Sequence, residues 1–366
     1  VASGDSPGGG VAGLKYLVLG TIGASLFLLG VGYAYVATGT LNMVDLSTSL
    51  AAAGYDSRVV LGAFGLVVTG LLVKVALFPV HSWQPGAYAS APRSVSVLIS
   101  ALVSTVAAYA VARVCFTVFT VDFFAAVPVA RRALLTVAAV SIVAGSVLAV
   151  LQRDLRRMLA YSSVAQFGMV VAAVALLSET AAVGAVIHLV GHAVLKGGLF
   201  AAVGVVSLRT GATTLAEYDG LADREPVCAA AIATLGLILV GVPPGVGFVG
   251  KWYMVLGALQ TGAWPVALVI LLSTVLTLAY VARVVERMYL TPADTSSTEH
   301  AAPENGTPDD GVDDVESPSP ATEDATVAPG MVAVVLVATI AALALGLLGT
   351  TIEGLLDPTL LEVFGR

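Results

Sequence analysis

The chain has 366 residues, of which 58% are hydrophobic and 11% are charged, and its mean hydropathy is +0.95. Soluble domains carry about 25% charged residues, so this composition excludes an ordinary soluble protein and indicates an all-α, polytopic membrane protein. The formal net charge of −7 arises within residues 291–329, which hold ten acidic residues and no Lys or Arg, whereas the remainder carries 17 basic and 14 acidic residues.

Nine apolar segments are long enough to cross a bilayer as helices. They are residues 14–36, 59–80, 95–113, 133–151, 158–177, 181–206, 227–256, 262–289 and 330–351. We expect residues 38–58 to form a loop with a short amphipathic piece. The aromatic residues 116–127 are expected to lie at a membrane interface.

The second apolar segment carries a lysine close to a proline. Lys74 lies five residues before Pro79, which cannot donate the helical hydrogen bond to the carbonyl of Val75. We therefore expect the helix to kink or break beside Lys74. Irregular backbone at membrane depth is tolerated where it is buried in protein or lines a cavity, although a lysine that snorkels to the headgroups also fits the pattern.

Hydroxyl groups mark the third and fifth segments. The interior of the third segment carries only hydroxyls as polar groups, including Ser100, Ser104 and Thr105. The fifth segment has a polar start that comprises Tyr161, Ser162, Ser163 and Gln166.

The sixth segment has a row of titratable residues at His188, His192 and Lys196. Each residue of a helix advances by about 100°, so positions i, i+4 and i+8 share one face with a drift of about 40° per step. A cation in hydrocarbon costs at least about 2.5–3.5 kcal/mol, so the row must face protein or water. A proton path needs such a row, and a polar face that joins two helices explains it equally well.

The seventh segment is interrupted by Pro243 and Pro244, and Lys251 follows the interruption. This pattern predicts a discontinuous helix, with a tight hairpin of two re-entrant halves as the alternative. The second and seventh segments are each interrupted beside a lysine, and they point in opposite directions because they are five segments apart. Broken helices at matching positions indicate a transport site between inverted repeats.

Lysine is used sparingly, at Lys15, Lys74, Lys196 and Lys251, and the other thirteen basic residues are arginines. Three of the four lysines lie inside apolar segments. Lysine can lose its proton when it is desolvated, whereas arginine stays charged. The distribution therefore indicates titration within the membrane.

The chain divides into a membrane domain at residues 1–290, an acidic loop at 291–329 and a C-terminal helix and tail at 330–366. The loop is rich in Pro, Ser, Thr, Gly and Ala, so we expect it to be disordered. With the N-terminus inside, nine basic residues lie at inside ends and five at outside ends, which favours a cytoplasmic N-terminus and an outside C-terminus in a prokaryotic cell membrane. An acidic loop is typical of a halophile, and a generic linker fits equally well.

Four stretches together resemble the antiporter-like subunits shared by respiratory complex I, membrane-bound hydrogenases and Mrp sodium/proton antiporters. They are LVKVALFPVHSWQPGAYASAPRSVSVLISALVS, LQRDLRRMLAYSSVAQFGM, HLVGHAVLKGGLF and VGVPPGVGFVGKW. A fifth stretch, LKYLVLGTIGASLFLLGVGYAYVATGTLNMVDL, is most similar to the D subunit of the Mrp group. The resemblance covers residues 14 to about 289 and implies two inverted five-helix repeats, with protons passing along buried lysines, histidines and a glutamate.

Carried over by position, the resemblance implies a proton relay of Lys74, His188, His192, Lys196 and Lys251. The chain departs from the family pattern in two ways. Many members have a lysine where this chain has Thr105, so the step from Lys74 to Lys196 would depend on water and on hydroxyls, among them Ser100 and Ser104. The family's glutamate lies on a helix before the first span found here, so we interpret the chain as lacking the N-terminal helices of the fold.

The resemblance implies a proton-translocating membrane subunit of an Mrp-type cation/proton antiporter complex, which is a transporter subunit and not an enzyme. The alternatives are a proton-pumping subunit of a redox complex and a truncated scaffold that conducts nothing. Cys115 and Cys228 lie in separate apolar segments without a CxxC motif, so we expect no metal or cofactor in this chain. The expected partners are protons, sodium, the bilayer and other membrane subunits, one of which supplies a buried carboxylate near Lys74; no nucleic acid is expected.

Overall fold

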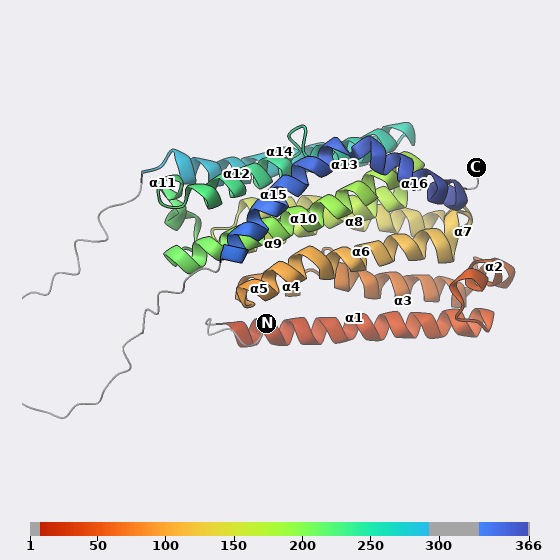
Figure 1. The fold of residues 1–366 in the computed structure, drawn as a ribbon. Coiled ribbons are helices and arrows are strands. Elements are labelled where there is room, and N and C mark those ends of the chain that lie inside the picture. Colours follow the sequence, from red (N-terminus) through yellow and green to blue (C-terminus); the bar gives the residue numbers. More distant parts are fainter. Residues whose placement is uncertain (1–7, 293–328, 365–366) are drawn as a thin grey trace, which may run out of the picture.

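The computed structural model describes residues 8–292 and 329–364, and the regular elements within them are helices (Figure 1). Eight helical stretches in these residues are long and apolar enough to cross a bilayer. Helices α12 (Pro226–Val240) and α13 (Val246–Gln260) follow one another in the same direction and together make a ninth crossing (Figure 1). The predicted all-α polytopic fold is confirmed. The predicted acidic loop lies almost wholly outside the described residues.

The long helices lie side by side in one bundle (Figure 1). The elements before the bundle centre are α1 (Gly9–Thr38), α2 (Met43–Ala53), α3 (Arg58–Val75), α4 (Trp83–Ser90), α5 (Arg93–Leu98), η1 (Ile99–Val103), α6 (Ser104–Arg113), η2 (Val114–Phe119) and α7 (Thr120–Ala126). Those that follow are α8 (Pro128–Val150), α9 (Leu155–Leu176), α10 (Glu179–Thr210), η3 (Leu215–Tyr218), α11 (Leu221–Arg224), α12, α13, α14 (Trp264–Tyr289), α15 (Pro329–Leu347) and α16 (Gly349–Phe364).

Two central helices, α9 and α10, are the most deeply buried of the long helices among the described residues. The most apolar stretch of α9 is 94% buried and that of α10 is 78% buried. Asp154 caps α9 by accepting a hydrogen bond from the N–H of Arg157 at 2.7 Å, and Ser178 caps α10. These caps fix where each helix begins, and therefore which residues of each helix reach the same depth.

Helix α1 lies at the edge of the bundle and packs on α3 through glycines. An added Cβ atom at Gly30 would lie 2.6 Å from the backbone nitrogen of Val67, and one at Gly70 would lie 2.6 Å from that of Phe27. Small residues allow such close backbone contact in membranes. The opposite side of α1 is open, since only 17% of its most apolar stretch is buried.

The aromatic residues 116–127, which were expected at a membrane interface, are helical as far as Ala126 and continuous with the third span. They continue the third span as a π-helical turn and α7, so the crossing runs over Arg93–Ala126. Phe119, Phe123 and Phe124 are buried and pack edge-to-face or tilted around Phe64 of α3. The aromatic rings are therefore part of the core between α3 and α7.

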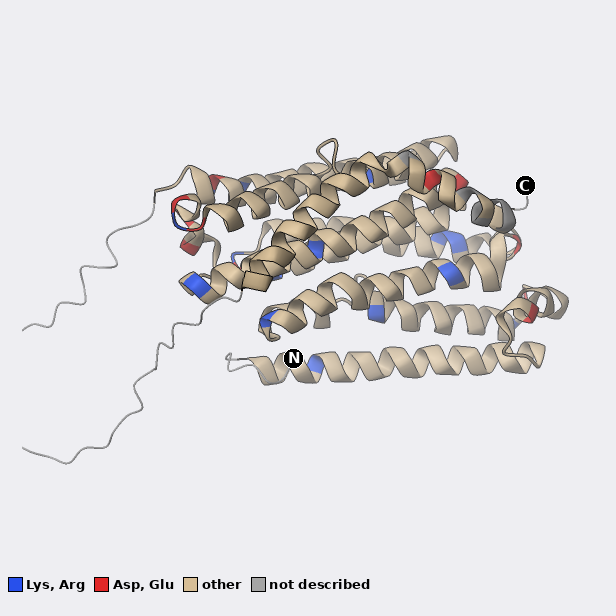
Figure 2. Ribbon diagram, viewed as in Figure 1, with Lys and Arg blue, Asp and Glu red and all other residues tan. Residues whose placement is uncertain are grey.

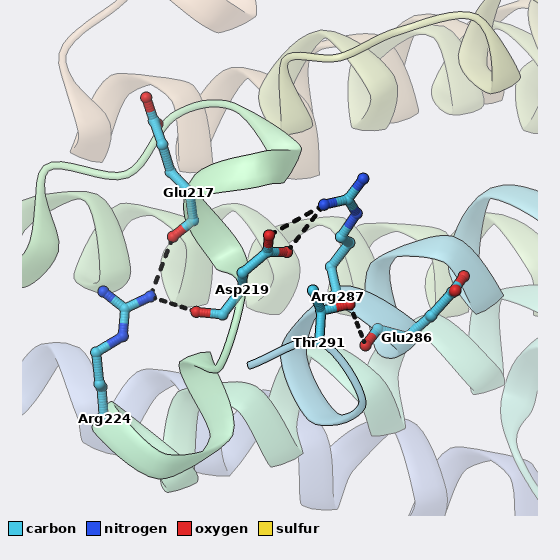
Figure 3. Close-up of polar contacts among 6 residues, drawn as sticks. All are labelled: Glu217, Asp219, Arg224, Glu286, Arg287 and Thr291. Carbon is cyan, nitrogen blue, oxygen red and sulfur yellow. Dashed lines mark hydrogen bonds and ion pairs between the residues drawn. The ribbon is translucent and has the colours of Figure 1, made fainter. Parts of the chain in front are cut away.

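Polar contacts hold the loop between α10 and α12 at one end of the bundle (Figure 3). The guanidinium of Arg287 on α14 donates to both carboxylate oxygens of Asp219, and Arg224 donates to the carbonyls of Glu217 and Asp219. Backbone hydrogen bonds join Leu215 to the carbonyl of Arg153. This end clamp, residues 213–225 with Arg287, fixes the start of α12 against α9 and α14.

Helix α15 runs obliquely across α10, α12 and α13 (Figure 1). Its contact with Gly198 of α10 is close, because a Cβ atom on this glycine would lie 2.8 Å from that of Ala338. Near the end of α15, Gly346 lies directly on the backbone of Pro244 and Gly245, where an added methyl group would collide with the Pro244 carbonyl. The last crossing therefore covers the interruption between α12 and α13.

Candidate functional site

The interruption between α12 and α13 creates a binding site for an ammonium group. Helix α12 ends at Val240, and Gly241 has a φ of 106°, a left-handed conformation that favours glycine. The last carbonyls of a helix have no partner in the helix and carry partial negative charge. Lys251 on α13 donates to two of them, Leu239 at 2.8 Å and Val240 at 3.0 Å, and is 6% exposed.

The predicted central lysine is the most enclosed charged side chain of the row. Lys196 is 0% exposed, and its ammonium group donates to the carbonyl of Leu159 at 2.8 Å and to the Ser162 hydroxyl on α9. No carboxylate of the described residues pairs with it. A buried ammonium without a counter-ion is costly, so the site favours a lysine that can release its proton.

His192 and His188 are buried on α10, between Lys196 and the contact of α10 with α13. A Cβ atom at Gly250 would lie 2.7 Å from that of His188, so α10 and α13 meet backbone to backbone beside Lys251. The helical row predicted from the sequence therefore turns inward, and its far end meets the second helix break.

The ring nitrogens of both histidines are buried without a hydrogen-bond partner in the described residues. The side-chain amide of Gln166 is buried without a partner as well. Buried polar groups in this state are where ordered water binds in proteins. The histidines and Gln166 therefore favour water between α9 and α10.

The first helix break lies at the end of α3. Ala76 adopts a left-handed conformation with φ 65°, and the N–H groups of Ala76 and Leu77 turn back onto the last carbonyls of the helix. The indole of Trp83 donates to the carbonyl of Val73 at 2.8 Å. The N–H of Phe78 donates to the Ser141 hydroxyl on α8 at 3.1 Å. The break expected beside Pro79 is therefore present, and its backbone is bound by a neutral donor, Trp83, and a neutral acceptor, Ser141.

Lys74 differs from the two buried lysines. It is half-buried, and its ammonium nitrogen lies against α1, 3.6 Å from where a Cβ atom of Gly20 would be. The described residues provide it with no hydrogen-bond or ion-pair partner. Nor does any hydrogen bond, ion pair or electrostatic interaction between described residues connect Lys74 to Lys196.

The three hydroxyl residues of the third span have different surroundings. Ser104 belongs to a buried cluster in which Gln84 donates to the Tyr88 hydroxyl at 2.9 Å and to Ser104 at 3.3 Å. Ser100 donates to a carbonyl of its own helix at 3.1 Å, and the hydroxyl of Thr105 is buried without a partner. Gln84 and Tyr88 were not among the site residues predicted from the sequence; glutamine and tyrosine in an apolar setting are the signal that could have found them.

The arrangement can bind and release protons. Lysine, histidine, glutamine and hydroxyl groups lie along one path through the second half of the bundle, and Figure 2 shows Asp and Glu only toward the two ends of the bundle. The described residues contain no group of three or more His, Cys, Asp or Glu that could hold a metal ion. Cys115 and Cys228 are both free and buried.

Comparison with known proteins finds relatives of this chain among subunits of NADH-quinone oxidoreductases and Na(+)/H(+) antiporters. The sequence matches the family described as "NADH:quinone oxidoreductase/Mrp antiporter, TM" over residues 3–277. The N subunit of the NADH-quinone oxidoreductase of Desulforudis audaxviator is 43% identical over 280 residues, which are 76% of this chain and 55% of that protein. The D subunit of the Na(+)/H(+) antiporter of Bacillus subtilis is 32% identical over 272 residues, 74% of this chain and 54% of that protein. The chain spans about half the length of these relatives.

Solved complexes contain chains of similar fold. A chain of the Mrp complex from Dietzia sp. DQ12-45-1b has a TM-score of 0.81 at 27% identity, and the match covers 97% of this chain and 68% of that chain. A chain of the archaeal membrane-bound sulfane sulfur reductase has a TM-score of 0.82 at 28% identity, with 99% and 68% covered. These matches confirm the antiporter-like fold class.

Proposed function

Because the chain belongs to the NADH:quinone oxidoreductase/Mrp antiporter family, we propose that it is a proton-translocating membrane subunit of a multi-subunit complex. The observation that carries the proposal is the enclosed row from Lys196 through His192 and His188 to Lys251. Its ends are held by backbone carbonyls and a hydroxyl in place of carboxylates. Such partners bind an ammonium group without preventing its deprotonation.

We propose Mrp-type cation/proton antiport as the use of this path, with sodium as the exchanged cation. The similarity to the D subunit of the Bacillus subtilis antiporter and the fold match to the Dietzia Mrp complex support this function. A proton-pumping subunit of a redox complex is the second candidate, and the 43% identity to an N subunit favours it. In that case partner chains would carry out the electron transfer.

Lys74 indicates what a partner polypeptide would have to provide. Its ammonium group lies half-buried beside α1 without a counter-ion in the described residues, and the other side of α1 is open. A cation at this depth needs an anion or water. We therefore propose that a second polypeptide supplies a membrane-embedded Asp or Glu near Lys74.

Membrane orientation and domain division complete the proposal. The N-terminus faces the cytoplasm of a prokaryotic cell, and residues 1–290 form the proton-translocating membrane domain. An accessibility assay on a cysteine placed at Thr38, which ends α1, tests the orientation, because this residue should react from outside the cell. Labelling from the cytoplasmic side would show that the orientation is the opposite of the one proposed.

Proton flux in liposomes that contain the assembled complex, followed with a pH-sensitive dye, tests the function. The Lys196→Ala variant should lower flux at least tenfold, because it removes the central proton site. Lys15→Ala is the matched control, since Lys15 is the exposed lysine of α1. Equal flux in Lys196→Ala and wild-type complexes would contradict proton transfer through α10.

The driving force separates the two candidates. A sodium gradient should drive proton flux in an antiporter complex, whereas a redox complex should respond to an electron donor and acceptor. Reconstitution of this chain alone tests the partner carboxylate: we expect no flux until a companion polypeptide is added. Crosslinking from position 74 should then reach the carboxylate-bearing helix, and Lys74-dependent flux by the chain alone would contradict the need for a partner.

A further inference from the structure

A groove between α5, α10 and α15 lies at the end of the bundle where α5 begins. Its volume is about 190 Å³, and its apolar wall includes Val97, Phe200, Ala201, Met331 and Val334. Val334 is 52% exposed, so the groove opens toward the outside of the bundle. Because the surrounding helices span the membrane, this opening faces lipid.

A single arginine lines the outer part of the groove. Arg93 is the first residue of α5, and its aliphatic stem lies along α10 at Gly204, where a Cβ atom would be 3.5 Å from that of Arg93. Its Nη2 atom donates to the Ser207 hydroxyl at 3.3 Å, whereas its Nε atom is buried without a partner. Neither ion pair found among the described residues involves Arg93.

A second arginine increases the positive charge beside the groove. Arg156 of α9 interacts electrostatically with Arg93, and its guanidinium donates to the carbonyl of Ala89 at 3.3 Å. The negative charge of Asp154 attracts Arg156, whereas the positive charge of Arg93 repels it. Arg93 therefore carries an uncompensated charge with a like charge near it, which favours an anion at this place.

The wall becomes more apolar with depth. Ser207 and Gly204 lie near the end of α10, whereas Phe200 and Ala201 lie one turn deeper, and Val97 is one turn into α5. Charge at the rim and hydrocarbon below it match an anionic headgroup above its acyl chain. Basic pockets between membrane helices bind phospholipid headgroups in this way.

We propose that this groove binds an anionic phospholipid, with its phosphate on the Arg93 guanidinium and part of one acyl chain along Phe200, Ala201 and Val334. The lipid joins α15 to α5 and α10, and so supports the helix that covers the second break. A soluble anion matches the arginine but leaves the apolar wall unfilled. The inference does not depend on proton transport.

Native mass spectrometry of the delipidated full chain, titrated with phosphatidylglycerol or with phosphatidylcholine of the same acyl chains, tests the proposal. Phosphatidylglycerol should bind about fivefold more tightly, as expected for one arginine contact near a membrane surface. Arg93→Gln should remove this preference. Arg113→Gln is the matched control, because Arg113 is exposed further along the same span, away from the groove.

Two further measurements identify the source of the anion. Val334→Trp places a bulky side chain over the opening from an exposed position and should weaken the binding of both lipids at this site. Glycerol phosphate should not raise the unfolding temperature of the wild type, whereas phosphatidylglycerol should. Equal affinity for the two lipids, a preference that survives Arg93→Gln, or stabilisation by glycerol phosphate alone would each overturn the proposal.

Discussion

Each of the two helix breaks has a lysine beside a helix end, but the surroundings of the two lysines differ. At the second break, Lys251 donates to two carbonyls at the end of α12, and α10 and α15 cover the site. At the first break, the indole of Trp83 donates to the Val73 carbonyl, which also accepts from the N–H of Ala76, and Lys74 points to α1 without a partner in the described residues. Among the described residues, the lysine at the second break therefore has hydrogen-bond partners, whereas the lysine at the first break has none.

The largest expected effect is on proton flux at the second break. Lys251→Arg keeps a positive charge for the two carbonyls, but arginine cannot release its proton. We expect flux through the assembled complex to fall at least tenfold, with the unfolding temperature nearly unchanged. Lys15→Arg should leave flux unaltered. Wild-type flux in Lys251→Arg would show that Lys251 has a structural role alone. It would contradict proton transfer at the second break.

The next effect concerns packing in the two halves. Gly250→Ala would place a methyl group 2.7 Å from the Cβ atom of His188, and we expect a loss of about 1–3 kcal/mol in unfolding free energy. Gly30→Ala makes an equally close contact, but α1 can move outward, so its loss should be smaller. Gly65→Ala, with open space around it, is the control. Denaturant unfolding in detergent measures all three, and an equal loss at Gly30 would mean that α1 is as confined as α10.

A third effect isolates the first break. Trp83→Phe removes the donor to the Val73 carbonyl and part of a buried ring, which should cost about 1–2 kcal/mol in unfolding free energy. Protection of the backbone around residues 73–78 in hydrogen exchange should fall with it. The α12–α13 break should keep its protection, since the two breaks share no hydrogen bond among the described residues. Loss of protection at both breaks would show that they open together.

The smallest effect concerns the end clamp, which has no counterpart in the described residues of the first half. Backbone N–H groups of Thr213 and Thr214 hold the pKa of the Glu217 carboxyl below its ordinary value of 4.5. A lowered folded-state pKa gives stability above the unfolded-state pKa, and this stability is lost as pH falls through the folded-state value. Glu217→Gln should therefore cost less than about 1 kcal/mol at neutral pH, because the carboxylate is exposed. The difference in unfolding free energy between Glu217→Gln and wild type should vanish in acid. A difference that stays constant with pH would exclude the carboxylate charge as its cause.

Local rules were enough to predict the nine spans, the helical row and both breaks. Proline removes a backbone donor wherever it occurs, and residues four apart share a helix face, so Pro243, Pro244 and the row from His188 to Lys196 could be interpreted without a structure. The partners of the lysines could not be predicted. Lys196 and Lys251 bind main-chain carbonyls of other helices, and such groups have no signature in the sequence.

Long-range packing also accounts for the remaining differences. Aromatic enrichment suggested a membrane interface for residues 116–127, but the packing of Phe119 and Phe123 on Phe64 of a distant helix could not be predicted from it. The exposure of Lys74 depends on what covers α1, and no local pattern around position 74 contains that information. The proton-relay roles of Lys74, Lys196 and Lys251 stay predictions for the flux measurements above.

Because Gly346 contacts the Pro244 backbone, a movement of α15 would report a change at the second break. With no room for even a methyl group between them, the break cannot change shape without displacing α15. Val337 on α15 and Val140 on α8 are exposed, so spin labels there would avoid the buried lysines and histidines. The distance between such labels, recorded at several pH values, would report rearrangement of the break from the lipid-facing surface.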